Sequence, residues 1–144
     1  MAVSGSTEFD VAATPEQVLD AVAAVEDLPQ RSSAHKSAEV ASRHPDGRPH
    51  RVRAEVSAAG FNDTEVTDYT WDEPASVSWT LVESSFQSTQ NGTYTLTATD
   101  SGTHVKLDLE IDVKVPLPGF ILKRVLRGAL DSGGKDFKKY VESR

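Results

Sequence analysis

The sequence predicts an α+β fold in which one antiparallel sheet packs against a C-terminal helix. Residues 105–115 alternate six apolar with five charged residues, which is typical of a strand with one buried and one solvated face. After Pro116–Gly119, apolar residues recur at helical spacing to the C-terminus, so this segment needs an apolar surface to cover. Turn-forming residues divide residues 45–102 at regular intervals, with no helical pattern between them.

The N-terminal part predicts one strand followed by one helix. Residues 3–11 alternate in the manner of a strand. Thr14 is a favourable N-cap, Pro15 suits the first helical position and Gln17 can complete a capping box. We therefore expect a helix over Pro15–Glu26. Its apolar side is formed by Val18, Leu19, Val22 and Val25.

The remainder before the C-terminal helix predicts six more strands. Residues 27–33 break the first helix and leave room for one extra helical turn. We expect strands at 36–41, 51–57, 64–71, 76–81, 86–99 and 103–115, which makes seven in total. Sequential hairpins are the simplest connection between them. The result is a curved antiparallel meander in a single domain, residues 1–144.

Alternation also predicts which side chains face the interior. In residues 86–99 the inward set mixes apolar, hydroxyl and amide groups, and buried polar groups require partners. That set is Phe86, Ser88, Gln90, Gly92, Tyr94, Leu96 and Ala98. Residues 64–71 allow two orientations: Tyr69 and Trp71 face inward with Glu65 and Thr67, or Val66 does with Thr64 and Asp68. The two aromatic residues favour the first.

The C-terminal segment predicts a long helix with one apolar side. That side comprises Leu122, Val125, Leu126, Ala129, Gly133, Phe137, Tyr140 and Val141. Gly128, Gly133 and Gly134 lie within it, although glycine in a helix interior costs about 1 kcal/mol relative to alanine. Tight packing on the sheet, a kink, or room for a ligand would each account for them.

Composition excludes several classes of function. The chain has no cysteine and a net charge of −7, which argues against disulfides, thiol chemistry and nucleic-acid binding. The charge is uneven, with net +4 in residues 120–144 and net −11 before them. No apolar run is long enough to span a membrane, so we expect a cytoplasmic protein with at most weak surface contact through Phe120–Arg127.

Metal and nucleotide chemistry have no support in the sequence. The four histidines, His35, His44, His50 and His104, fit no zinc-binding spacing. Phosphate-binding loops, dinucleotide-binding glycine patterns and nucleophile elbows are absent from the sequence. We therefore expect neither a metal nor a cofactor.

Several short motifs, in this order, resemble the START/Bet v 1-like (SRPBCC) superfamily, and specifically its polyketide cyclase/dehydrase and lipid-transport branch. They are Thr14–Val18, Leu28–Gln30, Trp79–Leu81, Gly92–Leu96, Gly102–Val105 and Pro116–Gly119. The resemblance implies a helix-grip fold, with one or two short helices after the first strand and a cavity between sheet and C-terminal helix. Where such relatives often have an aromatic residue after the Leu28 motif, this chain has Arg31.

The resemblance implies a protein that holds a lipid-like or polyketide-like molecule in that cavity, as a monomer or homodimer. One alternative is an aromatase/cyclase-like enzyme, with Tyr94, Gln90 and Arg31 as candidate catalytic groups. Another is a protein-interaction or co-chaperone module that uses the basic C-terminal helix. The candidate ligand-binding residues are Tyr69, Trp71, Trp79, Phe86, Ser88, Gln90, Tyr94, Leu107, Leu109, Leu122, Val125, Leu126 and Ala129.

Overall fold

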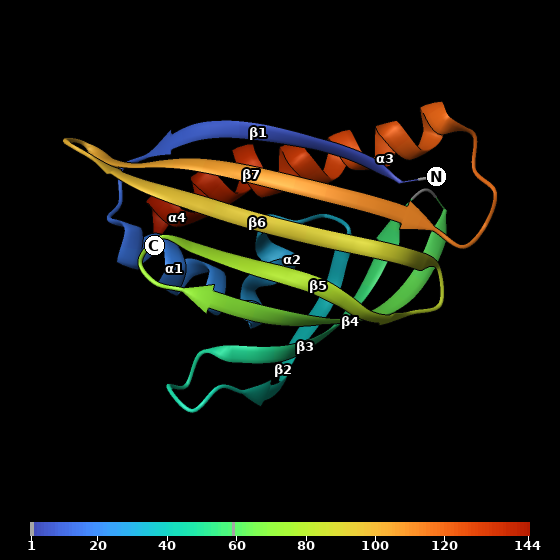
Figure 1. Ribbon diagram of the computed structural model, residues 1–144, viewed down its shortest axis with the longest axis horizontal. Coiled ribbons are helices and arrows are strands. Elements are labelled where there is room, and N and C mark those ends of the chain that lie inside the picture. Colours follow the sequence, from blue (N-terminus) through green and yellow to red (C-terminus); the bar gives the residue numbers. More distant parts are fainter. Residues whose placement is uncertain (1, 59) are drawn as a thin grey trace.

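The fold is one antiparallel sheet with all helices on its concave side (Figure 1). A computed structural model of the chain describes residues 2–58 and 60–144. Within these residues the sheet has seven strands in the order β1-β7-β6-β5-β4-β3-β2, as predicted. The strands are β1 (Val3–Val11), β2 (His35–Arg43), β3 (Pro49–Ala58), β4 (Phe61–Asp72), β5 (Ser76–Ser84), β6 (Gln87–Thr99) and β7 (Gly102–Val113).

Two helical regions lie against this sheet. The first comprises α1 (Pro15–Ala23), the 3₁₀ turn η1 (Val25–Asp27) and α2 (Leu28–Arg31). The second comprises α3 (Gly119–Asp131), the π-helical turn η2 (Ser132–Asp136) and α4 (Phe137–Ser143). Figure 1 shows α3 beside β1 and β7, with α4 and α1 at the opposite end of the sheet. The predicted helix-grip arrangement is therefore confirmed.

The first helix begins as predicted and ends earlier. Thr14 Oγ1 accepts a hydrogen bond from Gln17 N at 3.1 Å, and Gln17 Oε1 accepts one from Thr14 N at 2.9 Å, so the capping box forms. The prediction that the helix continues to Glu26 is wrong. Ala24 leaves the helical region with ψ of 65°, and the chain turns there so that Val25 becomes fully buried.

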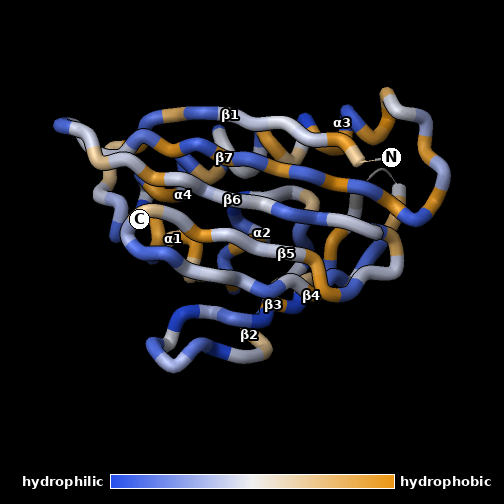
Figure 2. Tube along the Cα trace, in the orientation of Figure 1, coloured by the Kyte–Doolittle hydropathy of each residue, from blue (hydrophilic) through white to orange (hydrophobic). Residues whose placement is uncertain are grey.

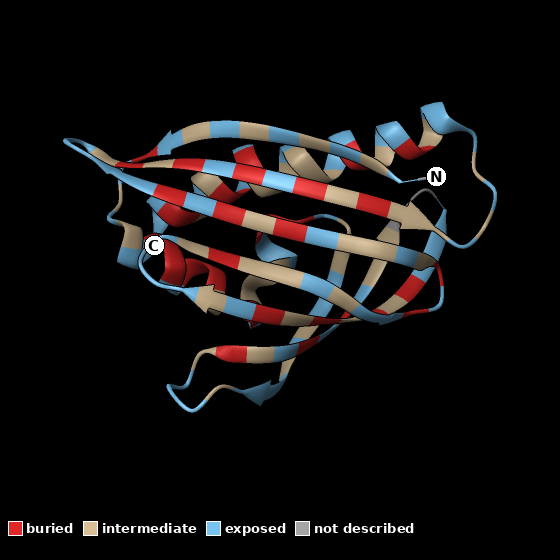
Figure 3. Ribbon diagram, viewed as in Figure 1, coloured by how far each residue is buried: buried red, intermediate tan, exposed pale blue. Residues whose placement is uncertain are grey.

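Inward-facing residues of β4 follow the favoured prediction. Glu65, Thr67 and Tyr69 are buried, while Thr64, Val66 and Asp68 between them are partly exposed. Figure 3 shows this alternation of buried and more exposed residues along the central strands. The side of β4 that bears Tyr69 therefore faces the helices, and the carboxylate of Glu65 lies on the same side.

A β-bulge at the start of β6 changes the predicted alternation. The pairing of β6 with β7 shifts between Gln87, opposite Val113, and Thr89, opposite Asp112. The prediction that Ser88 faces inward is wrong, because the extra residue of the bulge leaves Ser88 exposed. Gln87, which regular alternation places outside, instead points to the concave side, where it bonds with Glu65.

The C-terminal helix lies closest to the sheet at its π-helical turn. A Cβ added to Gly133 would lie 2.4 Å from Leu107 Cδ2, and one added to Gly134 would lie 3.2 Å from Thr7 Cγ2. Both distances are too short for an unaltered packing of the helix on β7 and β1. Tight packing therefore accounts for these two glycines, whereas Gly128 is exposed with no neighbour near its Cβ position.

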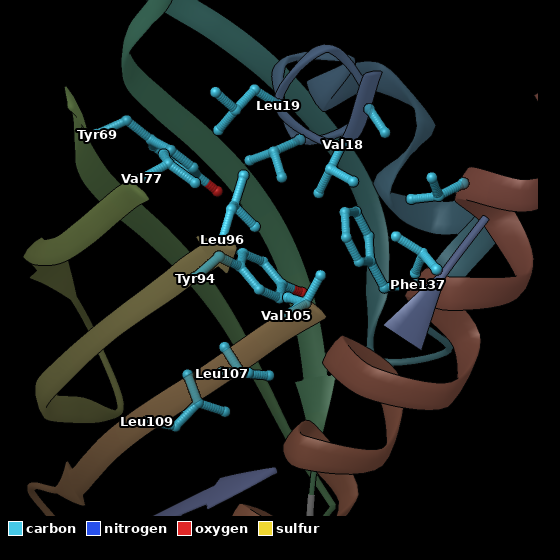
Figure 4. Close-up of a cluster of buried hydrophobic side chains, with 14 of the residues drawn as sticks. Val18, Leu19, Tyr69, Val77, Tyr94, Leu96, Val105, Leu107, Leu109 and Phe137 are labelled. Carbon is cyan, nitrogen blue, oxygen red and sulfur yellow. The ribbon is translucent and has the colours of Figure 1, made fainter. Parts of the chain in front are cut away.

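The main apolar core lies at the α4 end of the molecule. Side chains from α1, β5, β6, β7 and α4 meet there, and Figure 4 shows Tyr94 and Phe137 between Val18, Leu96 and Val105. Figure 2 shows the matching alternation of apolar and polar positions along the strands. Most of this end is filled with apolar side chains, so space for the apolar body of a ligand is expected further toward α3.

Candidate functional site

The concave face is less completely covered toward α3 than toward α4. At the α4 end, Val77, Val105 and Phe137 are at most 1% exposed. Toward α3, Trp79 and Gln90 on the sheet and Val125 on the helix face inward and remain partly exposed. This part of the concave face is the candidate site.

A buried carboxylate is the centre of the site. Glu65 on β4 is 7% exposed. Its Oε2 accepts hydrogen bonds from Gln87 Nε2 at 2.7 Å and Gln90 Nε2 at 3.0 Å. Its Oε1 lies 3.5 Å from His35 Nε2. Gln90 Oε1 in turn accepts a hydrogen bond from Trp79 Nε1 at 3.0 Å. Three strands and the start of β2 thus contribute to one polar network.

The network keeps Glu65 ionised despite its burial. Burial acts to raise the pKa of Glu65, since a charged carboxylate is poorly solvated there. The hydrogen bond and charge of His35, and then the amides of Gln87 and Gln90, oppose this effect and lower the pKa below its ordinary value. The site therefore presents a negative charge whose own hydrogen bonds are already made.

A second carboxylate, that of Asp63, binds the connection between β5 and β6 at the edge of the site. Asp63 accepts hydrogen bonds from Ser84 Oγ at 2.5 Å, and from Ser85 N and Ser85 Oγ at 2.9 and 2.8 Å. Burial acts to raise its pKa, but these hydrogen bonds and a longer one from Gln87 lower it overall. Asp63 thereby fixes the β5–β6 connection, from which Gln87 enters the site.

Aromatic rings in mutual contact, two pairs stacked and one tilted, form one wall of the concave face. Ring centroids are 5.8 Å apart for Tyr69 and Trp79, 5.6 Å for Trp79 and Tyr94, and 4.9 Å for Tyr94 and Phe137. Gly92 makes this possible, because a Cβ there would lie 2.1 Å from the Trp79 ring. The rings give the site a rigid, largely apolar surface.

The three predicted catalytic candidates do not converge on one point. Gln90 bonds within the Glu65 network. The Tyr94 hydroxyl donates to Gly133 O at 2.7 Å, and burial raises the pKa of Tyr94. The Arg31 guanidinium lies 5.0 Å from the Phe137 ring centroid, beyond Tyr94. Their catalytic assignment stays a prediction, and the geometry gives no shared acid–base pair.

Most of the predicted ligand-binding residues lie on the concave face or on the helix side that covers it, and three do not. Trp71 lies at the far end of β4, where its Nε1 donates to Pro49 O at 2.8 Å and its ring faces Arg48. Ser88 is exposed and leaves the set. Phe86 stacks on Phe61 with centroids 4.4 Å apart at the open end of the sheet. The others occupy the concave face or the helix side that covers it: Tyr69, Trp79, Gln90, Tyr94, Leu107, Leu109, Leu122, Val125, Leu126 and Ala129.

Sequence reasoning missed His35, Gln87 and Asp63 as members of the site. Asp63 lies in a segment with a turn-like composition, and Gln87 belongs to the polar side of a regular strand. The signal available was the pair Gln87 and Gln90, two amides three residues apart beside a predicted hairpin. Both can face one side only if the strand contains a bulge.

A hollow of about 450 Å³ opens between β1 and α3. Its lining includes the apolar residues Val3, Leu126 and Leu130 and the basic residues Lys123 and Arg127. A second hollow, of about 390 Å³, lies on the outer side of β1, β6 and β7 among polar residues. Phe120, at the start of α3, is 66% exposed.

Two further observations concern the residues that the structure describes. Across residues 2–58 and 60–144, no three histidine or acidic side chains cluster closely enough to hold a metal ion. Over the same ranges, no helix combines the length and apolar character needed to cross a bilayer.

A sheet curved around a C-terminal helix, with a partly exposed concave face that carries a few fixed polar groups, defines a ligand-binding protein of the helix-grip class. Residues 2–142 match the sequence profile of the family described as polyketide cyclase/dehydrase and lipid transport. The chain belongs to this family, and so to the START/Bet v 1-like (SRPBCC) superfamily, as predicted. A comparison with curated proteins finds no match.

Solved structures with the same fold are numerous. A START superfamily protein from Mycobacterium smegmatis is 26% identical, with a TM-score of 0.84 over 99% of this chain and 97% of the other. The Zhui aromatase/cyclase from Streptomyces sp. R1128 is 15% identical, with a TM-score of 0.83 over 100% and 96%. Ara h 8.0201 is 18% identical, with a TM-score of 0.72 over the full length of both chains. The last two likenesses concern the fold alone.

Proposed function

We propose that the protein binds a hydrophobic or amphipathic small molecule, lipid-like or polyketide-like, between the concave face and α3. The observation that carries this proposal is the partial exposure of inward-facing Trp79, Gln90 and Val125, in contrast to the closely packed apolar core near α4. Apolar surface that faces inward and still meets solvent is a binding surface of the kind small molecules use. The family description, which names polyketide cyclases and lipid transport, agrees with this ligand class.

The polar groups of the site are better suited to orient a bound ligand than to catalyse a reaction of it. The Glu65 network is internally satisfied through Gln87 and Gln90, so it can hold its shape without a ligand. The hollow between β1 and α3 is lined in part by Leu126 and Leu130, and we assign it as the opening through which a ligand reaches the concave face.

Binding can be tested with a fluorescent fatty acid and a variant that fills the site. Val125→Trp places a large ring on the inward side of α3 and is expected to weaken binding by about tenfold or more, equivalent to 1.4 kcal/mol or more. Ala129→Leu fills the same side with a smaller group and is expected to weaken binding less. Arg124→Trp, on the exposed side of the same helix, is the matched control.

Thermal unfolding of each variant separates a filled site from a disrupted fold. The proposal requires that the wild type binds at least one probe from a panel of fatty acids and aromatic polyketide-like compounds. It also requires that folded Val125→Trp binds that probe less well than Arg124→Trp does. Equal binding by both variants, or no binding of any panel member by the wild type, would overturn it.

A further inference from the structure

Arg31, the last residue of α2, has a buried side chain with unmet hydrogen-bonding capacity. It is 7% exposed. Its Nε is enclosed and has no acceptor, and it is the one such buried side-chain nitrogen or oxygen among the described residues. Within residues 2–58 and 60–144, neither a hydrogen bond nor an ion pair with a carboxylate involves its terminal nitrogens. A buried cation normally has such a partner.

Aromatic rings pack against the Arg31 guanidinium but give its N–H groups no hydrogen-bond acceptor. Its central carbon lies 5.0 Å from the ring centroid of Phe137 and 5.4 Å from that of Tyr140. Cation–π contacts of this kind compensate part of the charge. The rings offer no conventional hydrogen-bond acceptor, so the N–H groups of the guanidinium still lack acceptors.

Two acidic residues of neighbouring elements, Asp27 and Glu65, are engaged elsewhere. Asp27, one helical turn earlier in the chain, accepts hydrogen bonds from Tyr140 Oη at 2.5 Å and from Gln30 Nε2 at 3.2 Å. Glu65 is bound by the amides of the candidate site and by His35. Among the described residues, Arg31 therefore has no carboxylate partner.

The Tyr69 hydroxyl is a second polar group without a hydrogen-bond partner among the described residues, but unlike Arg31 Nε it is not fully enclosed. It is 8% exposed, and Figure 4 shows its hydroxyl pointing from β4 into the cluster of buried side chains. No described residue forms a hydrogen bond with that hydroxyl. Burial raises the pKa of Tyr69 to about 12, and the charge of Arg31 partly opposes this rise.

We propose that Arg31 and the Tyr69 hydroxyl bind the carboxylate of an amphipathic acid. This inference rests on the proposed function and names the ligand class for that site. The planar guanidinium matches the two oxygens of a carboxylate, and the tyrosine hydroxyl adds a further donor. The acid group lies near Phe137, and the apolar body extends along the aromatic wall toward α3.

The experiment compares an acid with its uncharged ester. We use cis-parinaric acid and its methyl ester, whose fluorescence reports binding directly, with wild type, Arg31→Met, Tyr69→Phe and the control Arg53→Met on the exposed side of β3. The wild type and the control are expected to bind the acid about tenfold or more tightly than the ester, since one charge-assisted pair is worth at least that factor. Arg31→Met is expected to abolish this preference and leave ester binding unchanged, and Tyr69→Phe to reduce it.

The outcomes separate this inference from the proposed function. Equal binding of acid and ester by the wild type, or an unchanged preference in Arg31→Met, overturns the inference and leaves the proposed function in place. Binding of neither probe nor any panel compound by the wild type overturns the proposed function itself. Arg31→Met is expected to fold, because replacing an unpaired buried charge by an apolar group of similar length is seldom destabilising. If its melting curve shows that Arg31→Met is unfolded, the test uses Tyr69→Phe, which removes only one hydroxyl. An unchanged preference for the acid over the ester in Tyr69→Phe then overturns the inference.

Discussion

Replacing Gly92 by alanine tests the aromatic wall on which the site depends. The new Cβ would lie 2.1 Å from Trp79 Cζ2 and 2.2 Å from Trp79 Cε2, whereas carbon atoms pack at about 3.5–4.0 Å. The indole ring must therefore move by more than an ångström. Because the ring is rigid and its nitrogen is bonded to Gln90, the movement breaks contacts on both sides.

The expected loss follows from those contacts. The hydrogen bond from Trp79 to Gln90 contributes about 1 kcal/mol. The ring contacts of Trp79 with Tyr69 and Tyr94 contribute about 0.5–1.5 kcal/mol each. Gly92→Ala is thus expected to lower the free energy of unfolding by about 2–4 kcal/mol. For a domain of this size, that corresponds to a melting temperature about 6–12 °C lower.

Urea denaturation followed by tryptophan fluorescence measures this change, since Trp79 is one of two tryptophans. Gly128→Ala is the matched control, because nothing lies within 4 Å of its Cβ position in α3. It is expected to raise stability by up to about 1 kcal/mol through helix propensity alone. If Gly92→Ala matches the wild type to within about 0.5 kcal/mol, the close packing of Trp79 on β6 is refuted.

Two further predictions concern single polar groups. Tyr94→Phe removes the donor to Gly133 O, leaves that carbonyl without its partner and is expected to cost about 1–2 kcal/mol in urea denaturation; an unchanged midpoint would contradict this role. The hydrogen bonds of Glu8 and then Asp10 raise the pKa of His104, so its contribution to stability is present below about pH 6.5 and is lost as pH rises through the folded-state pKa. NMR titration should therefore give His104 a pKa above 6.5 that falls in Glu8→Gln, and equal values in both proteins would contradict the pairing.

Much of the fold was accessible from the sequence because local and long-range preferences agree. The alternation in β7 and the capping box at Thr14 both predict the structures that form. The bulge in β6 was not accessible in this way. Its cause is the pairing of Gln87 and Thr89 with β7, which alternation within one strand does not specify. The one extra residue of the bulge explains why Ser88 and Gln87 were predicted to face the wrong sides of the sheet.

The site was less predictable than the fold, because its members are joined across distant parts of the chain. Glu65 could be identified as a carboxylate that needs partners if it faces inward. Its partners Gln87 and His35 are 22 and 30 residues away, and neither carries a local signal. The surroundings of Arg31 were not predictable either, because its aromatic neighbours Phe137 and Tyr140 come from the other end of the sequence.

The two buried charges of the concave side differ in a way that bears on function. Burial acts to raise the pKa of Glu65, but His35 and then the amides of Gln87 and Gln90 lower it overall, so folding alone stabilises its charge. Arg31 has aromatic neighbours and an enclosed Nε without an acceptor, so folding leaves part of its desolvation uncompensated. A ligand carboxylate supplies that compensation only in the bound state, and the gain then appears as affinity and as stabilisation of the folded protein by the ligand. Stability that rises more with the acid than with its ester is the thermodynamic consequence of this difference.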